Sequence, residues 1–275
     1  MVFLVVVSII WAFSFGLIGR FLQGVDAAVV STARLGLALL VFLPFLRIGK
    51  LPWRTGLTLV AIGGLQFGVM YLLYIRSFQY LQPHEAALFT ITTPIIVTLF
   101  ADALDRRLRW QALAAAVLAV LGTIPVARGA KDLSLTLAGI LLVQLSNAAF
   151  GIGQVLYKQL RARVDLRDRD VFGLMYAGGF AVALSLVVTR DVSLALTSQQ
   201  LWTLLYLGVL ASGLGFFLWN VGATRVTAGT LAVMNNAKVP LGVAASLAFF
   251  GGQTNLVALS VSLAALGAAV WLARR

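Results

Sequence analysis

The sequence predicts an all-α integral membrane protein with ten transmembrane helices, arranged as a 5+5 inverted-topology repeat. Three observations predict it: apolar stretches long enough to span a bilayer fill the chain, basic residues gather at alternate connections, and similar residues recur halfway along. A bilayer core about 30 Å thick needs about 20 residues of helix. Because lipid offers backbone groups no hydrogen bonds, and the runs show no alternation of polarity, helices are favoured over a barrel.

Ten apolar runs supply these helices in chain order. They lie near residues 2–19, 28–46, 56–75, 84–104, 110–127, 135–157, 171–189, 200–220, 228–249 and 255–273. The first run contains Trp11 and lacks an Ala-x-Ala cleavage site, so we interpret it as a span and not as a signal peptide. Pro94 and Pro240 lie inside the fourth and ninth runs, and each is expected to bend its helix because proline frees a backbone carbonyl.

The composition excludes several classes of function. With 61% hydrophobic and 11% charged residues, the chain has no room for a soluble domain of useful size. Without cysteine it forms no disulfide or iron–sulfur cluster, and one histidine with nine acidic residues argues against a metal site. We therefore expect no cofactor, no metal and no enzymatic activity. The net charge of +12 does not indicate nucleic-acid binding, because the basic residues lie beside the spans.

The positions of the basic residues predict the orientation of the chain. Five lie on one side of the predicted membrane: Arg20, Arg76, Arg128, Lys131 and Arg190. Fourteen lie on the other side, at the connections after the second, fourth, sixth and eighth runs and after the tenth. Cytoplasmic loops carry the excess of Lys and Arg, so both termini are predicted to be cytoplasmic.

The two halves of the chain resemble each other. Pro94 has a counterpart in Pro240, displaced by 146 residues. Four further residues recur at a displacement of 145: Gly63, Gly68, Tyr71 and Tyr74 return as Gly208, Gly213, Phe216 and Trp219. We predict a first repeat over 1–127 and a second over 135–275. Five helices is an odd number, so the second copy enters from the opposite side, which is typical of secondary transporters. An old duplication without mechanistic meaning is the alternative.

These residues resemble a known family. The run Leu88 to Gly122, with Pro94 and the turn Leu104–Asp105–Arg106–Arg107–Leu108, resembles the EamA module of the drug/metabolite transporter superfamily, and Gly213 to Gly267 resembles its second copy. The resemblance implies a multi-pass transporter of the bacterial inner membrane. The overall pattern looks most like the YddG-like exporters of aromatic amino acids. The family usually has Gly-Glu where this chain has Leu104–Asp105 and Gly252–Gln253.

Lys238 is the most informative single residue for a binding site. It lies near the middle of the ninth run, where a charge costs about 2.5–3.5 kcal/mol and should face a watery cavity or a partner. Asn235 precedes it by three residues and should share its helix face, with Gly242 and Ser246. We interpret Lys238 as an anchor for a substrate carboxylate. A structural bond to backbone carbonyls, or a neutral lysine, is the alternative.

Polar and aromatic stripes predict the remaining substrate-binding residues. Asn147 and Gln154 belong to a polar stripe with Gln144 and Lys158 on the sixth run, which lines the path or bonds a neighbouring helix. The aromatic candidates are Trp11 in the first run, Tyr71 in the third and Trp219 in the eighth, although the last also fits an interfacial belt.

Three further features of the sequence bear on the site and its surroundings. His84, beside Glu85 at the outer start of the fourth run, is a further candidate, although a solvated helix start explains it as well. Arg34 is interpreted as a snorkelling or structural arginine. The fifth and tenth runs are rich in small residues and should pack closely as supports or as a dimer face.

These observations together predict a secondary transporter that exports small amphiphilic metabolites, chiefly amino acids including aromatic ones, by alternating access through a central cavity between the repeats. Its partners are the small-molecule substrate and the lipid bilayer, with no nucleic acid, and both a monomer and a homodimer fit. A retinal-type receptor or pump would explain Lys238, but it requires seven helices and acidic counter-ions deep in the membrane. A membrane-embedded transferase needs paired carboxylates for a metal, and only Asp102 and Asp105 have that spacing.

Overall fold

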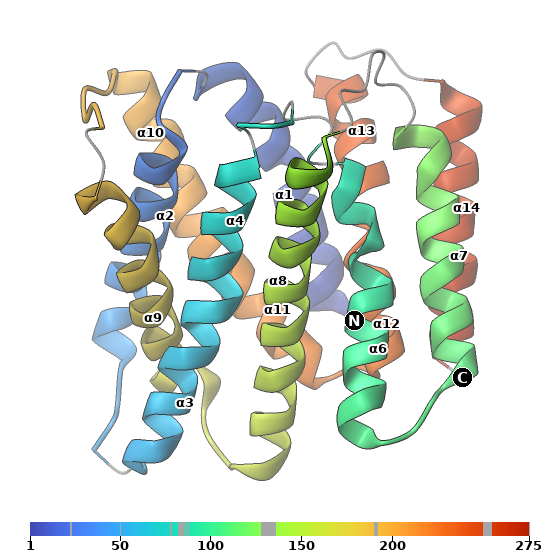
Figure 1. Ribbon diagram of the computed structural model, residues 1–275, viewed down its shortest axis with the longest axis horizontal. Helices are drawn as coiled ribbons and strands as arrows, with labels where there is room; N and C mark the ends of the chain where they lie inside the picture. The colour runs from blue at the N-terminus through green and yellow to red at the C-terminus, as the bar shows by residue number, and fades with distance from the viewer. Residues whose placement is uncertain are drawn as a thin grey trace.

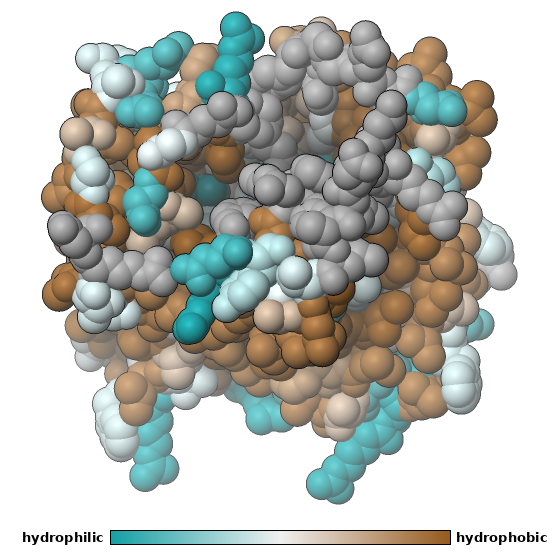
Figure 2. Space-filling model, turned by 45° about the horizontal axis from the view of Figure 1, so that its top comes forward, coloured by the Kyte–Doolittle hydropathy of each residue, from teal (hydrophilic) through white to brown (hydrophobic). Residues whose placement is uncertain are grey.

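The computed structural model describes residues 1–22, 24–49, 51–77, 79–81, 86, 88–127, 136–189, 192–249 and 255–274. Within these ranges the chain forms helices and connecting turns, and no strand is present. The helices stand side by side, with most of their ends at two opposite faces of the molecule (Figure 1). Hydrophobic side chains cover the flanks, and hydrophilic ones gather toward the upper and lower ends (Figure 2).

The helices fall into two sets along the chain. The first half contains α1 (Val2–Phe21), α2 (Ala27–Phe42), α3 (Trp53–Gly63), α4 (Met70–Ser77), α6 (Thr93–Asp105) and α7 (Trp110–Ala127). The second half contains α8 (Leu137–Arg163), α9 (Asp168–Val188), α10 (Ser198–Tyr206), α11 (Gly215–Thr224), α12 (Ala228–Met234), α13 (Lys238–Phe249) and α14 (Leu256–Ala273). Four short segments of other helical type join them: η1 (Leu43–Phe45), η2 (Gly64–Val69), η3 (Thr90–Thr92) and η4 (Leu207–Leu214).

Among the described residues, six continuous helices are long and apolar enough to cross a membrane. They are Ala27–Phe45, Trp53–Ser77, Leu137–Arg163, Asp168–Val188, Ser198–Thr224 and Leu256–Ala273. Val2–Ser14 and Trp110–Val126 are shorter apolar helices. The all-α membrane architecture predicted from hydropathy is confirmed.

The third and eighth predicted spans have the same unusual construction. Each begins as an α-helix, widens into a π-helical segment and continues as a second α-helix: α3, η2 and α4 in one, and α10, η4 and α11 in the other. Trp53 and Ser198 begin these spans, and Met70 and Gly215 begin their final helices, so both pairs of starts are 145 residues apart. Such π-segments are frequent at functional sites. Their recurrence confirms the internal repeat.

The fourth and ninth predicted spans are interrupted at equivalent points. The 3-10 segment η3 precedes α6, and a turn over 235–237 separates α12 from α13. In this turn the N–H groups of Asn235, Asn236 and Ala237 bond to carbonyls three residues back instead of four. Pro240 follows in the first turn of α13, where its missing N–H and its ring favour a new helix start over a continuous helix.

The ninth span, predicted over 228–249 with a bend at Pro240, is broken before the proline and not only bent. Met234 ends α12 and Lys238 begins α13. Asn235 and Lys238 are three residues apart across this 3-10-type turn, in which residues three apart lie on the same side, so their shared face stays a prediction. The physical reason is that the bend forms upstream of the proline, where the backbone must already have left the α-helical path.

Equivalent residues of the two halves meet at the centre of the molecule. The side-chain amide of Asn236 donates to the carbonyl of Ile91 at 2.8 Å, and these positions are 145 residues apart. Tyr71 and Phe216, also 145 apart, make an edge contact with ring centroids separated by 6.4 Å. A residue can touch its own counterpart only near the axis that relates the halves, so both contacts mark that axis.

The halves are also packed into each other through small residues. A Cβ added to Gly63 of α3 would lie 2.0 Å from the carbonyl oxygen of Met175 in α9. Helices α7 and α14 lie side by side (Figure 1), and a Cβ on Gly122 would lie 2.2 Å from the Cβ of Ala265. The close packing predicted for the small-residue helices is confirmed.

Candidate substrate site

Trp11 of α1 lies at the centre of an aromatic cluster. Its ring centroid is 4.9 Å from that of Trp219, 5.5 Å from that of Phe216 and 6.2 Å from that of Phe150. Its indole N–H donates to the carbonyl of Ala211 in the π-segment η4 at 2.9 Å. The rings come from α1, α8 and α11, so this cluster joins elements of both halves.

Lys238 approaches the aromatic cluster from the start of α13. Its Nζ lies 5.7 Å from the ring centroids of both Trp11 and Phe150, which is within the range of a cation–π contact. The side chain is half-buried. In the part of the chain that the structure describes, no carboxylate lies within ion-pair distance of this ammonium. Ring faces satisfy part of the charge but accept no full hydrogen bond, so the ammonium retains donors for an anion.

Gln154, Trp219 and Asn235 form a hydrogen-bonded network behind the cluster. The indole N–H of Trp219 donates to Gln154 Oε1 at 2.7 Å. Gln154 Nε2 donates to Asn235 Oδ1 at 3.3 Å, and Asn235 Nδ2 donates to the carbonyl of Leu231 at 2.9 Å. All three side chains are at most 1% exposed. In this conformation they tie α8, α11 and α12 together and are closed to water.

Arg34 of α2 is buried beside the same rings. Its Nε donates to Ser212 Oγ in η4 at 2.9 Å, and its Cζ lies 5.4 Å from the ring centroid of Tyr71. Tyr71 in turn contacts Phe216 of the aromatic cluster. With 8% of its surface exposed, Arg34 packs into the protein and does not reach out along the lipid as a snorkelling side chain does.

Asn147 contacts the interrupted fourth span and not the aromatic cluster. Its amide donates to the carbonyl of Phe89 at 2.9 Å, and Gln144 donates to the same carbonyl at 3.1 Å. Gln144 Oε1 also accepts from the hydroxyl of Thr92 at 2.7 Å. The polar stripe of α8 thus satisfies backbone groups that leave the α-helical pattern at η3. His84 lies outside the described residues, as does Glu85.

Two pockets formed by described residues have no predicted site residue in their lining. One, of about 420 Å³, lies between α1, α12, α13 and α14, and includes Met234, Leu241 and Arg274. The other, of about 370 Å³, lies beside Arg47 and Asp170 at a connection. The rings of the aromatic cluster pack together in this conformation, and the central cavity stays a prediction.

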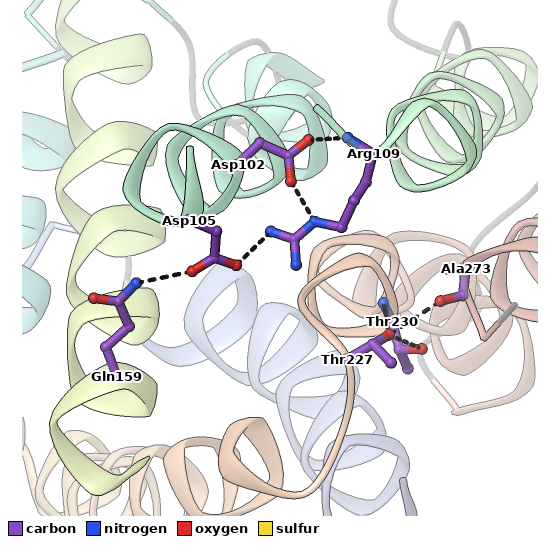
Figure 3. A network of polar contacts seen from close by, with 7 residues as sticks. All are labelled: Asp102, Asp105, Arg109, Gln159, Thr227, Thr230 and Ala273. Atoms are coloured by element: carbon purple, nitrogen blue, oxygen red, sulfur yellow. Dashed lines mark hydrogen bonds and ion pairs between the residues drawn. The ribbon is translucent and has the colours of Figure 1, made fainter. Parts of the chain in front are cut away.

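Asp102 and Asp105 are held by one arginine at the turn between α6 and α7 (Figure 3). The backbone N–H and Nε of Arg109 lie 2.9 and 2.5 Å from the carboxylate of Asp102, and its guanidinium lies 2.8 Å from that of Asp105. Gln159 of α8 reaches Asp105 at 3.4 Å. Both acids thus have a cationic partner, and they close the turn instead of presenting a pair of open metal ligands.

The comparisons with known proteins agree with this geometry. A model of the EamA-like transporter family matches residues 1–128 and 137–274. The chain belongs to this family. Membership confirms the predicted ten-helix transporter fold with an internal repeat. A solved crystal structure superposes with a TM-score of 0.81 at 20% sequence identity, covering 99% of this chain and 95% of its own, and this likeness shows the fold alone.

Curated relatives of this EamA-like transporter match over its whole length. A biotin transporter of Salmonella typhimurium is 41% identical over 100% of this chain and 93% of its own. A biotin transporter of Escherichia coli K12 is 39% identical with the same coverage. A probable biotin transporter of Pseudomonas aeruginosa is 42% identical over 99% of this chain and 96% of its own. None of these three names mentions amino acids, and the resemblance to YddG-like exporters stays a prediction.

Sequence reasoning did not place three residues of this EamA-like site in the site. Phe150 is one phenylalanine among many, and Phe216 stands out in the sequence only as the repeat counterpart of Tyr71. Arg34 could have been found, because an arginine inside an apolar run is as costly as Lys238. Its distance from the predicted span end suggested an interfacial role, and only the contacts with Ser212 and Tyr71 show otherwise.

Proposed function

We propose that this EamA-like transporter carries biotin across the bacterial inner membrane by alternating access between its two halves. The observation that carries the proposal is Lys238, an ammonium deep in a broken span that two aromatic rings contact and no described carboxylate neutralises. Biotin has one carboxylate on an aliphatic chain and a compact ring system. Lys238 binds the carboxylate, and the aromatic cluster around Trp11 packs against the apolar remainder.

The full-length relatives support biotin over amino acids. Three relatives that are 39 to 42% identical are named as biotin transporters or probable ones. An amino acid also carries an ammonium group, which needs an acidic or strongly accepting partner beside the carboxylate site. The acidic side chains among the described residues all lie at helix ends or connections: Asp26, Asp102, Asp105, Asp165, Asp168 and Asp170. A neutral second end, as in biotin, suits this charge pattern better.

The chain's division and orientation complete the proposal. Residues 1–127 and 135–275 form the two repeats, and both termini face the cytoplasm, in agreement with the excess of Lys and Arg on that side. The interrupted fourth and ninth spans meet where Asn236 donates to the carbonyl of Ile91. Phe67 of the π-segment η2 stacks on Phe216, which follows η4, with ring centroids 4.6 Å apart. Discontinuous helices at a repeat interface are where transporters of this architecture bind substrate.

Transport into proteoliposomes tests this function. Purified protein should mediate saturable uptake of labelled biotin, competed by unlabelled biotin. Lys238→Met should lower biotin uptake at least tenfold, because the carboxylate loses its partner, and should affect the neutral amide of biotin much less. Arg54→Met removes a positive charge from an exposed site and serves as the matched control, with uptake unchanged. Absence of protein-dependent biotin uptake refutes the function, and equal losses for biotin and its amide refute the role of Lys238.

A further inference from the structure

A second cation without an acidic partner lies inside the membrane region, on the other side of the aromatic cluster. Arg34 is 8% exposed, and its Nε donates to Ser212 Oγ at 2.9 Å. The two terminal nitrogens of its guanidinium donate to no described residue, and no described carboxylate pairs with it. A charge in the membrane region is costly unless its donors are used, so this edge of the guanidinium is suited to an acceptor on a substrate.

Arg34 and Lys238 are connected through one set of rings. Arg34 packs on Tyr71, Tyr71 contacts Phe216, and Phe216 contacts Trp11 with centroids 5.5 Å apart. Lys238 packs on the far member of this series, Trp11. A substrate that contacts these rings can therefore reach both cations.

The orientation of Arg34 is fixed by the π-segment η4. Ser212, which accepts from Nε, is fully buried, and its backbone carbonyl accepts from the hydroxyl of Tyr176 at 3.0 Å. Tyr176 also donates to the carbonyl of Gly213. Because Nε is held, the terminal nitrogens present a planar pair of donors in one direction. Such a fork matches an oxygen that accepts two hydrogen bonds.

We propose that Arg34 is a specificity-determining residue that binds the neutral carbonyl at the end of the substrate opposite the carboxylate. This inference rests on the proposed function. In biotin the acceptor is the ureido carbonyl, whose oxygen accepts two hydrogen bonds, while the single negative charge stays with Lys238. The site then selects acids of one negative charge that carry a carbonyl acceptor at the far end of a mostly apolar body.

Substrate analogues separate this role from a structural one. In 2-iminobiotin a protonated C=NH₂⁺ group replaces the ureido carbonyl, so the acceptor is lost and a positive charge faces Arg34. Competition against labelled biotin on the purified protein should show wild type favouring biotin over 2-iminobiotin at least a hundredfold. Arg34→Gln should reduce this preference at least tenfold while leaving the preference for biotin over biotin amide unchanged. Lys238→Met should reduce the preference for biotin over biotin amide and leave the preference for biotin over 2-iminobiotin unchanged.

Two further variants keep the result interpretable. Arg34→Lys retains the charge but lacks the fork. It should weaken biotin severalfold and leave the poor binding of 2-iminobiotin unchanged, so that the preference for biotin falls. Ser212→Ala retains Arg34 but removes the acceptor of its Nε. Its preference for biotin over 2-iminobiotin should lie between those of wild type and Arg34→Gln. If Arg34→Gln, or Arg34→Lys where the former does not fold, weakens biotin and 2-iminobiotin equally, Arg34 only joins α2 to η4 and the inference is wrong. Wild-type protein that binds no biotin overturns the proposed function and the inference together, whereas normal biotin binding without discrimination overturns the inference alone.

Discussion

Gln154 shows how a single buried amide positions the candidate site. Its oxygen accepts from Trp219 and its nitrogen donates to Asn235, so one side chain orients an aromatic residue of α11 and the residue that begins the break in the ninth span. A buried amide is stable only when its donors and acceptor are satisfied. Because buried Gln154 needs hydrogen-bond partners, it holds the side chains of Trp219 and Asn235 in place.

Replacement of Gln154 by leucine should destabilise the protein. Trp219 N–H and the Asn235 side chain would each lose a partner inside the core, at a cost of about 1–3 kcal/mol for each group left unsatisfied. Thermal unfolding in detergent measures the effect. Gln159→Leu is the control, because Gln159 makes one long 3.4 Å contact with Asp105 near the surface and should shift the midpoint little. Equal shifts for the two variants would show that the network contributes no stability.

The interruption between α12 and α13 is the feature of the helices that matters most for the site. It places Asn236 at the axis and Lys238 at the start of a helix, so that one short turn supplies two functional positions. In an unbroken helix, residues two apart point away from each other by about 200°. The 3-10-like turn and the proline after it change this relation.

Pro240→Ala should therefore impair transport more than it impairs folding. Alanine restores a backbone donor and favours helix by about 3 kcal/mol over proline in a helix interior, which shifts the break toward a continuous helix and displaces Lys238. Biotin uptake should fall at least fivefold at unchanged membrane expression. Pro125→Ala is a matched control, because Pro125 also lies inside a helix, α7, but is exposed, and α7 supplies no residue of the candidate site. Full uptake by Pro240→Ala would contradict a role for the break.

At the scale of the whole molecule, the connections on the two sides of the predicted membrane differ in their number of Lys and Arg residues. This difference predicts which connections face away from the cytoplasm. The chain contains no cysteine, so single cysteines report without a background. Ser193→Cys and Arg107→Cys lie at exposed connections on opposite sides of the predicted membrane. A membrane-impermeant thiol reagent should label Ser193→Cys in intact cells and Arg107→Cys only after permeabilisation. The reverse pattern would invert the proposed orientation.

Much of the fold was predictable because the signals are local. Apolar runs mark the spans, and glycines 145 residues apart mark the repeat, since close approaches such as Gly63 to Met175 tolerate no side chain. The candidate site was predictable only in part. Lys238 is conspicuous because of its cost in lipid, but the pairing of Arg34 with Ser212, 178 residues away, depends on packing that no local pattern records. The exact place of the break likewise depends on Asn236 finding a partner in the other half.

The contact between Asn236 and Ile91 also bears on the energy balance between the two working states. Alternating access exchanges the roles of the two repeats, so a perfectly symmetric chain would populate its inward- and outward-facing forms equally. Here the amide donor is present in one repeat only. Ile91, the equivalent residue of the first repeat, has no polar side chain that could donate to the backbone of Asn236. A hydrogen bond is worth about 0.5–1.5 kcal/mol, so we expect the form seen here to be favoured up to about tenfold at rest. Asn236→Leu should bring the two populations closer together, measurable as more equal labelling of a central cysteine from each face, and an unchanged ratio would place the bias elsewhere.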